Sequence, residues 1–322
     1  MFQTSISIPD HMKKILSITI LLFITTIAFA QSANYKIVYN VLEDREKDNY
    51  EVYSMNMDGT GKKNLTNTPG VEWVYYAYEN KVYYISDMDT CHRCYFLYEM
   101  DADGNNKRKI SDLQLEDSWM GSRNKGTEMI VSGRVGKLRQ QLFLIDIKTG
   151  KYQQLSNDTV SYKNDPVFSP DGNEIILRYR PDRKLRQTVF DELWLLDNKA
   201  QPIRQLTNFP KADTTTQWFE YHAGPPQWNS KHQFISYMSR QNKQTQIYAT
   251  SLDGKKQWQL TKGELSSGWH TWSPDGEWLV MDRSTNEGKN FDIYLMHYAT
   301  GKITRLSDDP KTEQAPVFVK KN

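Results

Sequence analysis

The side chains best suited to chemistry in this sequence are rings and imidazoles in two segments of its second half. They are Trp218, Tyr221, His222, Trp269 and His270. Flat aromatic faces stack on sugars and on apolar parts of peptides, and imidazoles exchange protons near neutral pH. His222 lies in a long aromatic segment and is the better functional candidate. His270 precedes a Ser-Pro-Asp-Gly turn, where a structural role is the first interpretation.

Charged side chains recur at matching positions of a repeated unit, each at the end of a predicted second strand. They are Arg134, Arg180, Arg240 and Asp87. Guanidinium groups bind carboxylates through paired hydrogen bonds, so arginines beside aromatic rings suit sugars, uronates or peptide carboxylates. The alternative is that these arginines are solvated or paired with neighbouring acids, since surface ion pairs are common.

The only two cysteines, Cys91 and Cys94, are three positions apart. In an exported protein this spacing favours a local disulfide. A zinc site would need two further ligands, and only His92 is close in sequence. We expect no metal and no cofactor, although His92, His222 and His270 are the histidines that one face of the predicted fold could bring together.

Motifs of nucleophilic or metal-dependent catalysis are missing from the sequence. It contains no Gly-x-Ser-x-Gly elbow, no His-Glu-x-x-His pair and no phosphate-binding glycine loop. Whether the chain is an enzyme therefore stays open, and a non-catalytic role is favoured.

A repeated cassette supplies the frame for these residues. An aliphatic and an aromatic residue are followed, twelve residues after the aromatic one, by Leu or Ile and then Thr or Ser. The six copies are Val52-Tyr53 with Leu65-Thr66, Leu97-Tyr98 with Ile110-Ser111, Leu142-Phe143 with Leu155-Ser156, Leu193-Trp194 with Leu206-Thr207, Ile247-Tyr248 with Leu260-Thr261, and Ile293-Tyr294 with Leu306-Ser307. Repeats about 45 to 54 residues long are typical of propellers and related arrays.

Each repeat predicts four short strands. Asp-Gly or Thr-Gly lies inside five cassettes and favours a tight hairpin, because glycine adopts positive φ without steric cost. The fourth cassette has Asn198, Lys199 and Ala200 there instead. A second motif precedes the cassette and is clearest at residues 166–172 and 270–276. It predicts two strands joined by a turn.

The two ends of the chain complement each other. Residues 315–318 match the first strand of a unit, and residues 35–41 match the second strand of a unit that lacks its first. Their pairing would close a ring and leave no free strand edges. The predicted fold class is all-β: a six-bladed β-propeller of four-stranded antiparallel blades, forming one domain over residues 31–322.

The Ser-Pro-Asp-Gly turns, Ile-Tyr strands and Leu-Thr ends resemble the WD40-like (PD40) repeats of TolB-type propellers. The resemblance covers nearly the whole chain after residue 30, without the additional amino-terminal domain of TolB. Related repeats occur in binding scaffolds, accessory domains of peptidases and pectin-fragment lyases. The resemblance therefore implies the propeller fold more strongly than any activity.

In such blades the inter-blade loops and the loops between second and third strands emerge on one face. The longest segments, 209–225 and 180–190, belong to these two classes, as does the segment with both cysteines. Loops on a rigid scaffold commonly carry binding function. We expect the ligand or partner on this face.

The amino terminus has the pattern of a signal peptide over residues 1–30. Met12 is the expected true start, followed by two lysines, an apolar run and an Ala-Phe-Ala cleavage site. Removing this segment changes the formal charge from +2 to +1. A near-neutral chain argues against nucleic-acid binding, and no further run is long enough to span a membrane.

Three functions remain at this stage. The first is an exported, periplasmic or secreted, monomeric and non-catalytic module that binds a protein or glycan. The second is a carbohydrate- or uronate-active enzyme, a lyase or hydrolase with or without a metal. The third is a periplasmic envelope-assembly factor, by analogy with TolB.

Overall fold

The computed structural model describes residues 34–285, 288 and 290–321. The described residues from 36 to 321 belong to one compact unit. The predicted signal peptide and its start at Met12 lie outside the described residues. No helix among the described residues is long and apolar enough to cross a membrane.

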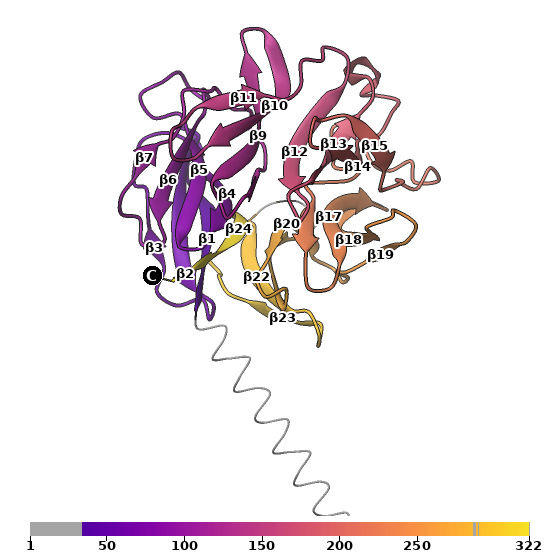
Figure 1. The fold of residues 1–322 in the computed structure, drawn as a ribbon. Coiled ribbons are helices and arrows are strands. Elements are labelled where there is room, and N and C mark those ends of the chain that lie inside the picture. Colours follow the sequence, from indigo (N-terminus) through magenta and orange to yellow (C-terminus); the bar gives the residue numbers. More distant parts are fainter. Residues whose placement is uncertain (1–33, 286–287, 289, 322) are drawn as a thin grey trace, which may run out of the picture. The chain divides into compact units, whose positions relative to one another are not determined.

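The compact unit is a six-bladed β-propeller whose blades are four-stranded antiparallel sheets (Figure 1). Strands are given in sheet order, starting from the inner strand. Blade one contains β24 (Glu313–Lys320), β1 (Tyr35–Asp44), β2 (Asn49–Asn56) and β3 (Lys63–Asn64). Blade two contains β4 (Glu72–Tyr78), β5 (Lys81–Ser86), β6 (Phe96–Asp101) and β7 (Arg108–Lys109). Blade three contains β8 (Gly121–Arg123), β9 (Glu128–Val135), β10 (Leu138–Asp146) and β11 (Tyr152–Gln154).

The second half of the ring repeats this order. Blade four contains β12 (Tyr162–Phe168), β13 (Glu174–Arg180), β14 (Glu192–Asp197) and β15 (Pro202–Gln205). Blade five contains β16 (Gln227–Asn229), β17 (Phe234–Gln241), β18 (Gln244–Ser251) and β19 (Gln257–Gln259). Blade six contains β20 (Ser266–Trp272), β21 (Trp278–Ser284), β22 (Asp292–His297) and β23 (Lys302–Arg305). A short 3-10 helix, η1 (Arg183–Leu185), lies between β13 and β14.

Hydrogen bonds explain the fixed spacing of the sequence cassette. In all six blades the N–H of the Leu or Ile donates to the carbonyl of the aliphatic residue, as from Leu65 to Val52, at 2.8 Å. In five blades the Thr or Ser side chain accepts the N–H of that aliphatic residue, as Thr66 does from Val52 at 2.9 Å. The exception is Ser111, whose hydroxyl donates to the Gly150 carbonyl at 2.8 Å. A change of spacing would break these paired bonds, so the cassette length is conserved within the chain.

The glycine of the outer hairpin packs against the neighbouring blade. Gly150 has a φ of +71°, and a Cβ atom there would lie 2.1 Å from the Ile110 carbonyl oxygen of blade two. Gly59 approaches the Leu306 carbonyl of blade six in the same way, at 2.4 Å. Glycine is therefore required both for the backbone conformation and for the close contact between blades.

Substitution at this position has a matched control within the chain. Gly301 has a φ of +67°, but a Cβ atom there would meet nothing within 4 Å. We expect Gly301→Ala to lower the free energy of unfolding by about 1 kcal/mol, from backbone strain alone. Gly150→Ala adds the clash with Ile110 and is expected to cost about 3 kcal/mol. Urea unfolding of both variants measures the difference, and equal losses would show that this close contact contributes nothing.

The ring closes as the sequence predicts, because β24 is the neighbour of β1 in the sheet of blade one. The Leu42 N–H donates to the Thr312 carbonyl at 3.0 Å, and the inner strand packs its buried side chains into the core shared by blades one to three. Figure 1 shows the yellow carboxy-terminal strand beside indigo β1. The carboxy terminus therefore completes the first blade.

Inner strands are irregular where they face the centre of the ring. The register shifts between Val74 and Tyr76 in β4, between Asn164 and Val167 in β12, and between Ser267 and His270 in β20. Asp165 at one of these bulges has a φ of +57°. A bulge interrupts the alternation of side chains, so residues at these points turn toward the centre.

Candidate functional site

A cavity of about 280 Å³ lies at the centre of the loop face, the face on which inter-blade loops and loops between second and third strands emerge. We call it the central cavity, and all six blades contribute to its wall. Its lining residues are Tyr50, Val71, Trp73, Tyr75, Arg93, Tyr95, Asp117, Trp119, Asp165, Tyr221, Trp269 and Gln314. Seven of these twelve side chains are aromatic.

The aromatic rings form a continuous wall. The Trp73 centroid lies 4.8 Å from that of Tyr50 and 5.7 Å from that of Trp269, with an edge-to-face angle of 85° in the second pair. Tyr75 continues the wall to Trp119, with centroids 5.5 Å apart. Tilted and edge-to-face contacts are favourable arrangements of aromatic pairs, so these rings stabilise one another in the wall.

Asp117 is the carboxylate most open to the cavity. Its side chain is 51% exposed, and its Oδ1 accepts a hydrogen bond from the Tyr75 hydroxyl. Although about half of this side chain is accessible to water in the cavity, the protein atoms packed around it raise the pKa of Asp117, and the Tyr75 hydrogen bond opposes that shift. The Arg93 Nη1 atom lies 3.8 Å from its Oδ2, a long ion pair.

The guanidinium of Arg93 is mainly committed to another acid. Its Nε and Nη2 atoms donate to the two carboxylate oxygens of Asp48 at 2.7 and 2.8 Å. The Arg93 backbone N–H donates to Asp87 Oδ2 at 2.7 Å, and Asp87 Oδ1 accepts the Val71 N–H at 2.9 Å. Asp87 thus positions the segment that carries Arg93, and a disulfide joins Cys91 and Cys94 in that segment.

Asp165 also lines the cavity and is paired with a cation of its own. The Arg178 Nε atom lies 3.2 Å from Asp165 Oδ2, and Arg178 Nη2 donates to the Tyr162 hydroxyl at 2.7 Å. The same guanidinium lies over the Tyr221 ring, 4.7 Å from its centroid. Burial raises the pKa of Asp165, and the positive charge of Arg178 opposes the shift. The charge of Asp165 is therefore balanced inside the protein.

Two of the predicted site residues, Tyr221 and Trp269, line the central cavity. Trp269 and His270 lie in the inner strand β20 and not in the entry loop of blade six. Trp218 lies in the predicted long loop and is 40% exposed, with the Arg186 guanidinium 4.5 Å from its ring centroid. It is outside the cavity wall.

The predicted arginines stand where the sequence places them, at the ends of β9, β13 and β17. Each is paired with an acid, as the alternative interpretation held. The pairs are Arg134 with Glu116 at 3.1 Å, Arg180 with Asp191 at 3.3 Å, and Arg240 with Glu220 at 2.8 Å. None of the three lines the central cavity, so they give no support to a uronate site there.

The histidines have separate surroundings. His222 is buried between Phe190 and Phe209, with ring centroids 4.3 and 4.8 Å away, and burial lowers its pKa. His270 is fully buried and its Nε2 lies 2.8 Å from Ser236 Oγ; burial lowers its pKa to about 4. His92 is exposed beside Asp48. Among the described residues, no group of three or more His, Cys, Asp or Glu side chains is arranged to hold a metal ion.

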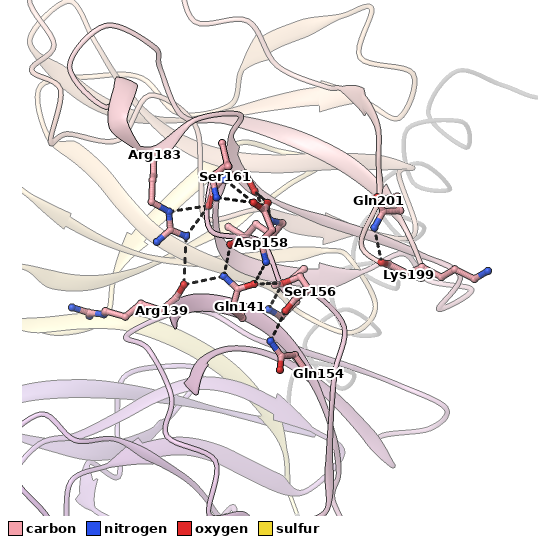
Figure 2. A network of polar contacts seen from close by, with 12 residues as sticks. Arg139, Gln141, Gln154, Ser156, Asp158, Ser161, Arg183, Lys199 and Gln201 are labelled. Carbon is pink, nitrogen blue, oxygen red and sulfur yellow. Dashed lines mark hydrogen bonds and ion pairs between the residues drawn. The ribbon is translucent and has the colours of Figure 1, made fainter. Parts of the chain in front are cut away.

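The loop between β13 and β14 is fastened to blade three and to the preceding inter-blade loop (Figure 2). The Arg183 guanidinium donates to the Ser161 carbonyl at 2.8 Å and reaches the Arg139 carbonyl at 3.5 Å. Gln141 donates to the carbonyls of Arg139 and Asp158 at 3.1 and 2.8 Å. The Arg183 N–H also donates to the Val160 carbonyl. These bonds hold the two loops as one rigid surface.

No protein-family model matches the chain. The uncharacterized peptidase YuxL of Bacillus subtilis is 23% identical over 129 residues, which are 40% of this chain and only 18% of that protein. TolB from Acinetobacter baumannii has a similar structure, with a TM-score of 0.67 and 15% identity over 88% of this chain and 67% of the TolB chain. Oligogalacturonate lyase from Vibrio parahaemolyticus has a TM-score of 0.50 and 13% identity over 80% and 71% of the two chains. The chain is thus a six-bladed propeller structurally similar to that of TolB.

Proposed function

We propose that this protein is an exported, non-catalytic binding module that holds a partner protein on its loop face. The observation that carries the proposal is a group of exposed apolar side chains in blades three to five, which we call the loop-face patch. Its members are Val135, Val160, Leu185, Trp218 and Phe219. All five lie in, or at the edge of, inter-blade loops and loops between second and third strands.

The chemistry of the patch favours protein over glycan. Phe219 is 68% exposed and packs edge to face with Trp218, with centroids 5.5 Å apart. Valine, leucine and phenylalanine side chains offer no hydrogen bonds to sugar hydroxyls. Exposed aromatic side chains together with exposed aliphatic ones on the same face are instead typical of protein interfaces. The bonds that fasten the Arg183 loop keep part of this surface preorganised, which lowers the entropic cost of binding.

Export is supported by two independent features. The charged start, apolar run and small-residue cleavage pattern of residues 12–30 have the form of a signal peptide. The disulfide between Cys91 and Cys94 suits an oxidising compartment. We therefore place the binding function in the periplasm or outside the cell.

Size-exclusion chromatography of extracts from cells that naturally make the protein tests the proposal. The wild-type chain is expected to elute in a complex larger than a monomer, held by the patch. The double variant Trp218→Ala, Phe219→Ala is expected to shift to the monomer position, because aromatic anchors commonly contribute about 2 kcal/mol or more each.

A matched control removes aromatic area from another surface. Tyr152 and Trp258 are exposed on the outer strands β11 and β19. The variant Tyr152→Ala, Trp258→Ala is expected to elute with the wild type. A shift in both variants, or in neither, would contradict binding through the loop face.

A further inference from the structure

The central cavity combines aromatic walls with a carboxylate whose charge is only partly neutralised. Asp48 accepts hydrogen bonds from the Nε and Nη2 atoms along one edge of the Arg93 guanidinium, and Asp165 is paired with Arg178. Asp117 is left with a single cationic atom at 3.8 Å. An open carboxylate in partly desolvated surroundings gains most from a ligand that brings positive charge.

The walls suit the same kind of ligand. The face of an aromatic ring is electrostatically negative and attracts ammonium groups within about 6 Å of its centroid. The wall of seven tyrosine and tryptophan rings surrounds the space beside Asp117. Arg178 already uses the Tyr221 ring in this way, at 4.7 Å. An anionic ligand would meet these ring faces and Asp117 unfavourably.

We propose that the central cavity binds an alkylammonium group, with Asp117 as its counterion and the ring wall as its cage. The inference rests on the proposed function, and the ammonium group it assigns to the partner is a lysine side chain. Tyr75 acts as a positioning residue, because its hydroxyl holds Asp117 in place. A cavity of about 280 Å³ has room for a side chain of this length.

Calorimetric titration with small probes tests the charge requirement. Choline is compared with 3,3-dimethyl-1-butanol, which has the same shape and hydroxyl group but no charge. Nα-acetyl-lysine methylamide is the second cation and carries the amide carbonyls of a peptide. We expect both cations to bind at least about tenfold more tightly than the neutral alcohol. Tighter binding of the lysine derivative than of choline assigns the source to a protein side chain.

Variants of the carboxylate test the site. Asp117→Asn keeps the shape and is expected to weaken choline binding about tenfold. Tyr75→Phe keeps the ring and is expected to weaken it by a smaller factor, about threefold. Asp112, which is 92% exposed and pairs with Lys109, provides the control Asp112→Asn with unchanged affinity. Thermal melting of each variant verifies that it folds.

Three results would overturn the inference: equal affinity for choline and the neutral alcohol, unchanged affinity in Asp117→Asn, or no binding of either cation. Failure here is distinguishable from failure of the proposed function. If the loop-face double variant loses its partner but choline does not bind, only the ammonium assignment falls. If choline binds but wild type and double variant elute alike, the cavity assignment stands and the protein-binding role falls.

Discussion

A chain lacking residues 313–322 is expected to aggregate instead of forming a folded propeller. These residues include β24, the inner strand of blade one, whose Val317, Phe318 and Val319 side chains are buried. Each buried side chain of this size contributes about 1.5–3 kcal/mol, so the summed loss approaches the whole stability of a typical domain. The deletion also leaves β1 as an unpaired edge at the centre of the ring, which promotes association with other chains.

The matched control removes only residues 321–322, because Lys321 is exposed. That chain is expected to be monomeric and to melt like the full-length protein. Far-ultraviolet circular dichroism and light scattering measure both outcomes. A soluble 313–322 deletion with an unchanged melting transition would contradict closure of the ring by its last strand.

Stability is also expected to fall as the pH rises through neutrality, because of one buried carboxyl group. Asp282 is fully buried; its Oδ2 accepts the Ala315 N–H at 2.9 Å, while its Oδ1 has no hydrogen-bond partner among the described residues. Burial raises the pKa of Asp282 from 3.8 to about 7. A raised pKa means that the folded state holds the proton more tightly than the unfolded state does. The stabilisation is complete below pH 3.8 and is lost as the pH rises through about 7.

The variant Asp282→Asn isolates this effect. Between pH 5.5 and 8.5 the wild type is expected to lose about 2 kcal/mol more of its free energy of unfolding than the variant loses. His270 acts in the opposite direction, because its lowered pKa reduces stability as the pH falls below about 6.5. That contribution is common to both proteins and cancels in the comparison. Urea unfolding at the two pH values measures the loss of unfolding free energy in each protein. Equal losses in the wild type and in Asp282→Asn would show that burial does not penalise the charged form of Asp282.

The sequence predicts the blades well because each cassette carries its own hydrogen-bond requirement. Leu65 must reach the Val52 carbonyl, and Thr66 must reach the Val52 N–H, so a twelve-residue interval repeats in every blade. The closing strand is predictable for the same reason, since residues 315–318 carry the pattern of an inner strand. Local rules of this kind do not depend on the rest of the ring.

The central cavity is harder to predict, because only Tyr221 and Trp269 of its lining residues are among the predicted site residues. Trp73, Tyr75 and Asp165 lie in inner strands. In a regular strand, successive side chains alternate between the two faces of the sheet. Bulges at Tyr75 and Asp165 reverse that alternation and turn these residues to the centre. The positive φ of Asp165 is not signalled by a glycine. The aromatic character of Trp73 and Tyr75 is the one available signal.

The predicted arginines illustrate a second limit. Arg134, Arg180 and Arg240 are equivalent in sequence, and their positions at strand ends are confirmed. Their partners come from loops that differ between blades, so the pairing depends on how each loop folds back. Sequence position alone therefore predicts where an arginine lies and leaves its availability to a ligand undetermined.

Site-specific photo-crosslinking tests the use of the loop face most directly. A photoreactive residue is placed at Phe219 in the loop-face patch or at Tyr152 on an outer strand, two exposed aromatic positions on different surfaces. Irradiation of cells that naturally make the protein is expected to give one covalent adduct of defined mass from position 219, with little or none from position 152. Equal adduct yields from both positions, or an adduct from position 152 alone, would contradict the account.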